Sequence, residues 1–195
     1  IDVASNTTIA TIPVGAAPDG VAASPGGTRV FVANNADNTV SVINTATNGV
    51  IAIIPVGAGP TGVAVTPGGT RAYVTNSGAG TVSVIDTATN TVIATIPVGA
   101  TPTDVAVTPG GTRAYVTGFG SNNVSVIDTA TNTVIATIPV GETPILVAFT
   151  LGGTRAYVTN FGSNTVSVIN TATNTVEATL GVGDAPSHVA IANVP

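Results

Sequence analysis

A ten-residue segment, Pro67–Asn76 (PGGTRAYVTN), recurs along this chain at constant spacing and limits the fold more than any other feature. Related copies begin at Pro25, Pro109 and Leu151, each 42 residues after the last. No insertion or deletion interrupts this period. A strict period of this length is typical of repeat proteins, in which each copy is one supersecondary unit stacked on its neighbours. The sequence therefore predicts one domain over residues 1–195 rather than several.

Each repeat has the pattern of four short strands. The full repeats are residues 16–57, 58–99, 100–141 and 142–183. In the second repeat the stretches rich in Val, Ile, Thr and Tyr are Gly62–Thr66, Arg71–Asn76, Thr81–Asp86 and Thr91–Val98. Pro-Gly-Gly-Thr and Thr-Ala-Thr-Asn turns separate strands, since Gly and Asn tolerate left-handed backbone. Four-stranded units at this period predict an all-β fold, a β-propeller of four complete blades.

The chain ends supply parts of a further repeat. Residues 1–15 match the end of a repeat and residues 184–195 match its beginning. We expect an outer strand at Thr7–Val14 and an inner strand at Ser187–Ala192, which together would form a split, two-stranded fifth blade and close the ring. The alternative is an open arc whose edges pair with another copy of the chain, as a closed oligomer or a filament.

Several of these motifs resemble those of a known family. The Tyr-Val-Thr-Asn sequences at Tyr73–Asn76 and Tyr157–Asn160, with the preceding Gly-Gly-Thr-Arg, are similar to the YVTN-family β-propeller repeat, as are Val84–Asn90 and Ile96–Gly99. The resemblance covers the whole chain. It implies a propeller fold and a place at the cell surface, outside the cell or in the periplasm. The chain also looks distantly like lactonase-type and virginiamycin B lyase-type propellers, which are enzymes.

The composition excludes several classes of function. Charged residues make up only 7% of the chain, the net charge is −5, and the only cations are four arginines at one repeat position. Nucleic-acid binding requires a basic surface, so it is not expected. The chain has no Cys, hence no thiolate nucleophile or thiolate metal site. No apolar run reaches the roughly 20 residues of a membrane span.

The arginines are expected to face polar residues across a hairpin. Pairing the second and third strands from their shared loop places Arg71 opposite Asp86 and Arg113 opposite Asp128. The same offset pairs Arg29 with Asn44 and Arg155 with Asn170. Such exposed cross-strand pairs contribute about 0.2–1 kcal/mol each.

Stability is expected to come from packing between blades, because a single four-stranded sheet cannot cover both of its faces. The apolar residues assigned to this packing in the second repeat are Val63, Val65, Tyr73, Val82, Val84, Ile93 and Ile96. Glu177 replaces the Ile of the other repeats, so it is expected to be exposed or at an assembly edge.

Differences between the repeats locate the candidate site. The two kinds of tight turn share one face of the molecule. The opposite face carries the fourth-to-first strand connection and the second-to-third strand loop, and its sequence varies most. Binding residues concentrate on variable loops held by a rigid scaffold. The candidate ligand-binding residues at the mouth of the central channel are Asp19, Thr61, Asp104, Glu142, Asp184 and His188.

These residues leave several chemistries open. Clustered carboxylates suit a hard cation, so a divalent cation is one alternative, although no known calcium-loop spacing is present. His188 with Asp104 or Asp19 would supply a base and its orienting group for a hydrolase or lyase. No nucleophile elbow, phosphate loop or zinc spacing occurs, so no catalytic residue is assigned and no cofactor is predicted. The leading hypothesis is a non-enzymatic scaffold, adhesion or binding module, with surface ligands or further copies of itself as partners.

Overall fold

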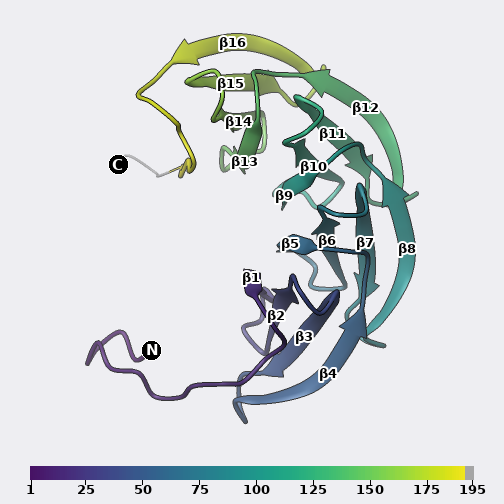
Figure 1. Cartoon of the computed structure of the whole chain (residues 1–195), viewed down its shortest axis with the longest axis vertical. Coiled ribbons are helices and arrows are strands. Elements are labelled where there is room, and N and C mark those ends of the chain that lie inside the picture. Colours follow the sequence, from purple (N-terminus) through teal and green to yellow (C-terminus); the bar gives the residue numbers. More distant parts are fainter. Residues whose placement is uncertain (192–195) are drawn as a thin grey trace.

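The computed structural model describes residues 1–191 and contains four antiparallel sheets of four strands, the blades of a β-propeller. Figure 1 shows these blades side by side in an open arc, with the first strand of each blade innermost and the fourth outermost. No helix in this part of the chain is long and apolar enough to cross a membrane. Blade 1 consists of β1 (Pro18–Ala23), β2 (Arg29–Asn34), β3 (Thr39–Asn44) and β4 (Gly49–Pro55). Blade 2 consists of β5 (Pro60–Val65), β6 (Arg71–Asn76), β7 (Thr81–Asp86) and β8 (Thr91–Pro97). Blade 3 consists of β9 (Pro102–Val107), β10 (Arg113–Gly118), β11 (Asn123–Asp128) and β12 (Thr133–Pro139). Blade 4 consists of β13 (Pro144–Phe149), β14 (Arg155–Asn160), β15 (Thr165–Asn170) and β16 (Thr175–Gly181).

The turn chemistry of the sequence explains where the strands end. The second Gly of each Gly-Gly pair has positive φ, as at Gly69 (69°), and so does the Asn of each Thr-Ala-Thr-Asn turn, as at Asn90 (55°). Both residue types accept this conformation at low cost. Thr87 Oγ1 donates to the carbonyl of Gly69, so the two turns lie together. We call this end of the blades the turn face and the opposite end the loop face.

The hairpin register is the one expected from the sequence, but the arginine side chains have different partners. Arg71 lies opposite Asp86, Arg113 opposite Asp128, Arg29 opposite Asn44 and Arg155 opposite Asn170. Asp86 Oδ1 instead accepts the backbone N–H groups of Thr89 (2.9 Å) and Ala88 (3.0 Å) in its own turn. These bonds hold the pKa of the Asp86 carboxyl below its usual value. An Asn accepts the same bonds, as Asn44 does, so the position requires an acceptor rather than a negative charge.

The core lies between blades, as expected. Three buried apolar clusters are present, and each joins residues of two neighbouring blades. The cluster between blades 2 and 3, for example, contains Tyr73 and Ile96 from one blade and Val105 and Ile127 from the other. The assignment of Ile93 to the core was wrong, because Ile93 is 48% exposed. It is the extra residue of a β-bulge on β8, which interrupts the alternation of side chains between the two faces.

Polar bonds on the turn face also join each blade to the next. Arg29, Arg71 and Arg113 each donate through Nη1 to a turn carbonyl of the following blade, at Thr87, Thr129 and Thr171 respectively. Two tyrosines reach the next turn as well: Tyr73 Oη donates to Asn132 Oδ1 at 3.0 Å and Tyr115 Oη to Asn174 Oδ1 at 2.6 Å. Hydrogen bonds with a charged donor are stronger than neutral ones, so the arginine bonds are the stronger of the two kinds.

We expect Phe31→Tyr to stabilise the protein by about 1 kcal/mol. Blade 1 has Phe31 where blades 2 and 3 have Tyr, and the carboxamide oxygen of Asn90 on the next blade is buried without a hydrogen-bond partner. A hydroxyl at this position would donate to Asn90 Oδ1 as Tyr73 does to Asn132. Urea unfolding followed by circular dichroism checks the gain, and Tyr115→Phe is the matched reverse change. An unchanged or lower midpoint for Phe31→Tyr would contradict the assignment.

The predicted fifth blade does not form within residues 1–191. Thr7–Val14 contains no strand, and the only pairing near the N-terminus is an isolated bridge between Asp2 and Thr7. The predicted inner strand at Ser187–Ala192 is also absent up to residue 191, and its last residue lies outside the described part. Figure 1 shows both terminal segments on the open side of the arc. A two-stranded sheet buries too little apolar surface to stabilise itself, which accounts for the difference.

Candidate functional site

A cavity of about 300 Å³ opens where the four inner strands begin, and we call it the mouth cavity. Two consecutive residues of every inner strand line it: Asp19–Gly20, Thr61–Gly62, Thr103–Asp104 and Ile145–Leu146. In each blade these two residues lie at an irregularity in the pairing between the first and second strands. A bulge releases side chains from the ladder and redirects them, so the same distortion places all four pairs at the cavity.

The threonine hydroxyls of the mouth cavity are held by neighbouring strands. Thr61 Oγ1 lies 2.9 Å from Thr75 Oγ1 and donates to the carbonyl of Thr103 on the next blade at 2.9 Å. Thr103 repeats this arrangement with Thr117 Oγ1 at 3.0 Å and the carbonyl of Ile145 at 3.1 Å. No base contacts either hydroxyl among the hydrogen bonds found for residues 1–191. These hydroxyls therefore link the inner strands.

Asp104 is an acidic side chain of the mouth cavity that contacts the neighbouring blade. Its Oδ2 accepts the backbone N–H of Val147 on blade 4 at 3.1 Å. Burial raises the pKa of the Asp104 carboxyl, while the N–H groups of Val147 and Val105 and the charge of His188 act in the opposite direction. Burial is the largest of these effects, because removing a carboxylate from water disfavours its charged form. A perturbed carboxyl group in a concave site is typical of functional positions.

The structure gathers only part of the predicted site. Asp19, Thr61 and Asp104 line one cavity, as the sequence predicted for the channel mouth. Glu142 and Asp184 are exposed on the loop face and do not line it. Asp184 Oδ1 instead accepts the side-chain amide of Asn164 at 3.4 Å. His188 is exposed, and its charge acts on Asp104 without a hydrogen bond between the two side chains.

Within the described part of the chain, the structure does not bring together the side chains for a metal site or for the base and acid of a hydrolase. Within residues 1–191, no group of three or more His, Cys, Asp or Glu side chains is close enough to hold a metal ion. The Nδ1 of His188 lies 3.0 Å from Ser187 Oγ, and both residues are exposed. A hydrolase would need a base oriented by a buried acid, and the imidazole is not held by Asp104 in this way.

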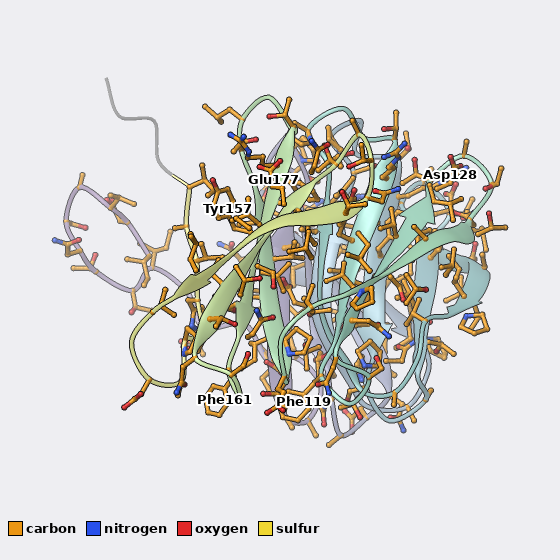
Figure 2. All side chains as sticks on the ribbon, turned by 90° about the horizontal axis from the view of Figure 1, so that it is seen from above. Phe119, Asp128, Tyr157, Phe161 and Glu177 are labelled. Carbon is orange, nitrogen blue, oxygen red and sulfur yellow. The ribbon has the colours of Figure 1, made fainter. Side chains whose placement is uncertain are left out.

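The sequence did not identify the whole lining. Thr103 and Ile145 occupy the repeat positions of Asp19 and Thr61, so comparison of these aligned positions could have found them. Two exposed aromatic side chains, Phe119 (37%) and Phe161 (42%), also occupy equivalent loops of blades 3 and 4. Figure 2 shows them at the end of the blades opposite Asp128, on the loop face. The four arginines lie near the turn face, so the loop face is acidic and aromatic without a Lys or Arg.

Residues 2–145, nearly three quarters of the chain, match the choice-of-anchor I domain. The chain belongs to this family. Membership in the choice-of-anchor I domain family agrees with a β-propeller repeat protein, but it does not support the YVTN family specifically. No curated protein matches the sequence.

Solved structures share the fold of this choice-of-anchor I domain. It is similar to Kuenenia stuttgartiensis hydrazine synthase over 87% of this chain and 50% of that chain, with a TM-score of 0.82 and 28% identity. It is also similar to a functionally unknown protein from Desulfotomaculum acetoxidans DSM 771, over 89% of this chain and 59% of that chain, with a TM-score of 0.77 and 21% identity. The domain thus spans between half and three fifths of the length of these structures.

Proposed function

We propose that this protein is a non-enzymatic binding module at the cell surface, and that its mouth cavity takes a positively charged group of its ligand, such as a lysine ammonium. The family name, choice-of-anchor I domain, supports a place at the cell surface or outside the cell. The repeat resemblance to YVTN-type propellers supports the same location. The observation that carries the proposal is the half-buried carboxyl of Asp104, whose pKa is raised, in a cavity that no Lys or Arg lines.

The lining suits an alkyl ammonium better than a bare metal ion. Asp104 and Asp19 supply negative charge, and the backbone and hydroxyl oxygens of Thr61 and Thr103 lie beside them. Ile145 and Leu146 add an apolar wall on one side. A lysine side chain has a compact charge on a long apolar stem, and it could bury the stem against this wall. A hard metal ion would instead require a closer cluster of oxygen ligands.

We expect Asp104→Asn to weaken the binding of a lysine-containing peptide by about tenfold or more, since a hydrogen bond to a charged group contributes about 1.5–3 kcal/mol. Asparagine keeps the size of the side chain and can still accept the Val147 N–H. The measurement is an NMR titration of labelled protein, with the same peptide carrying an acetylated lysine as the neutral control. Equal affinity of both proteins for the lysine peptide would exclude Asp104 as the binding group. Failure of the wild type to distinguish the two peptides would overturn the proposed function.

The raised pKa of Asp104 predicts how the affinity for the lysine-containing peptide changes with pH. A bound ammonium favours the ionised carboxylate, and burial raises the pKa of Asp104 in the free protein. The affinity should therefore rise with pH through this raised pKa and fall when the carboxyl is protonated at lower pH. In Asp104→Asn the affinity should show little of this dependence.

A further inference from the structure

Blade 4 exposes an apolar face, and the equivalent face of each preceding blade is buried against its neighbour. Tyr157 and Val166 are partly exposed and Leu180 is 47% exposed on this face of blade 4. Their counterparts in blade 3, namely Tyr115, Val124 and Ile138, are at most 3% exposed, because blade 4 covers them. The face of blade 4 therefore keeps the apolar residues of an inter-blade contact, and no other part of residues 1–191 covers it as a blade would.

The first blade has the complementary face. Val21 on β1 is 64% exposed, whereas its counterparts Val105 and Val147 are 3% exposed against the preceding blade. Thr45 in the turn of blade 1 is exposed, whereas Thr87 in the turn of blade 2 is buried under the arginine of blade 1. Blade 1 thus has the residues with which each later blade packs against the blade before it.

The polar groups of the two faces also match. Every observed contact between blades places an Arg of one blade at the turn Thr carbonyl of the next, and two of the three add a Tyr–Asn bond. Arg155 and Tyr157 are the corresponding donors on blade 4. The corresponding acceptors on blade 1 are the carbonyl of Thr45 and the side chain of Asn48, and no arginine of residues 1–191 contacts Thr45. Donors and acceptors therefore lie at opposite ends of the same arc (Figure 1).

Blade 4 differs from the other blades at Glu177. This residue occupies the bulge position that holds Ile51, Ile93 and Ile135 in the other blades, and it forms an ion pair with the Arg155 Nε. Figure 2 shows Glu177 and Tyr157 close to the turn end of blade 4. The ion pair gives Arg155 a partner while no turn carbonyl is available. The Nε atom of Arg155 carries this ion pair, whereas Arg29, Arg71 and Arg113 donate to the turn carbonyls through Nη1.

We propose that blade 4 of one chain docks on blade 1 of a second copy, so that two chains close one eight-bladed ring. Each copy contributes four blades, and rings of about four to eight blades are the usual range for propellers. The contact is head-to-tail, and in a two-fold ring it occurs twice. Arg155 would donate to the partner's Thr45 carbonyl and Tyr157 to the partner's Asn48, as Arg71 and Tyr73 do within the chain.

The mass in solution tests the closed ring. Light scattering of the 195-residue chain over a dilution series should give twice 18.8 kDa at high concentration and 18.8 kDa at low concentration. A monomer at every concentration would overturn the proposal. A mass that grows continuously would show open filaments, and this would contradict closure of the ring.

Two substitutions test which faces meet. Val21→Lys and Leu180→Glu each place a charge on a face that is exposed in the monomer, so folding should not change, but burial of the charge in the dimer should weaken association by about 30-fold or more. Ile93→Lys is the matched control, because Ile93 is also 48% exposed but lies on the outer strand of blade 2, outside all three clusters. Equal masses for Val21→Lys, Leu180→Glu and the wild type would exclude these faces. Circular dichroism and the urea midpoint of dilute samples verify that each variant is folded.

Mixing the two variants distinguishes a head-to-tail contact from other dimers. In a mixed ring, blade 4 of the Val21→Lys chain meets blade 1 of the Leu180→Glu chain, and this contact is entirely wild type. The second contact carries both substitutions, whose charges are opposite. An equimolar mixture should therefore contain more dimer than either variant alone. A mixture that contains no more dimer than either variant alone would contradict the head-to-tail arrangement.

Discussion

Replacement of Tyr115 by Ala should destabilise the protein by about 3–5 kcal/mol, the largest loss that we expect from a single side chain. Tyr115 is completely buried between blades 3 and 4. Its ring meets Phe149 edge-on with a centroid separation of 5.1 Å, and its hydroxyl donates to Asn174 at 2.6 Å. The substitution removes both contacts and leaves a cavity, and it leaves Asn174 Oδ1 without this donor.

Tyr157→Ala is the matched control for this prediction. Tyr157 has the same residue type at the same repeat position, but it is only partly buried because no further blade covers it within residues 1–191. In protein dilute enough to dissociate the proposed dimer, its loss should cost about 1 kcal/mol. Urea unfolding followed by circular dichroism gives both values. Similar losses for the two variants would show that the blades are stabilised within themselves rather than by their neighbours.

The repeat period made most of the fold predictable. Strand positions in blade 2 agree with the structure to within two residues, because Gly and Asn turns fix where each strand can begin and end. The register of the central hairpin followed from its short loop. The apolar clusters between blades followed from the need of each sheet to cover both faces, and the cluster that contains Tyr73 and Val105 is one of them.

The errors came from features that a repeat pattern does not contain. Strict alternation assigned Ile93 to the core, but a bulge changes the alternation at that residue, and bulges depend on pairing in three dimensions. The split fifth blade required two segments from opposite ends of the chain to pair without a wide sheet to support them. Local strand propensity cannot supply that support, so Thr7–Val14 has no strand.

The position of the candidate site could be predicted from the sequence, but the set of residues that line it could not. Variation among the repeats pointed to the loop face, and Asp19, Thr61 and Asp104 do line one cavity there. Sequence variation alone could not separate these residues from Glu142 and Asp184, which vary equally but lie outside the cavity. The distinction depends on the bulge at the start of each inner strand, since only residues within it turn toward the mouth cavity.

Gly20→Ala should destabilise the protein by about 3 kcal/mol, because the added methyl group would meet backbone rather than a movable side chain. A Cβ at Gly20 would lie 2.0 Å from the carbonyl oxygen of Thr61 and 3.1 Å from the Cα of Gly62. The inner strands of blades 1 and 2 would have to separate. Gly26→Ala is the control, since a Cβ there meets no atom within 4 Å and the residue lies in an exposed turn.

The mouth cavity is asymmetric, with glycines at one repeat position in blades 1 and 2 and larger side chains at that position in blades 3 and 4. Substitutions at this position test the cause of the asymmetry. Gly20 and Gly62 allow the close approach of the inner strands of blades 1 to 3. Asp104 and Leu146, at the same repeat position in blades 3 and 4, place side chains at the cavity. Leu146→Ala shortens such a side chain without a clash, so it should enlarge the cavity at little cost to the close contact between blades 1 and 2. Thermal unfolding of Gly20→Ala, Gly26→Ala and Leu146→Ala measures these differences. A Gly20→Ala variant as stable as Gly26→Ala would mean that the inner strands can separate freely, and the position of Asp104 in the cavity would then not be fixed by the scaffold.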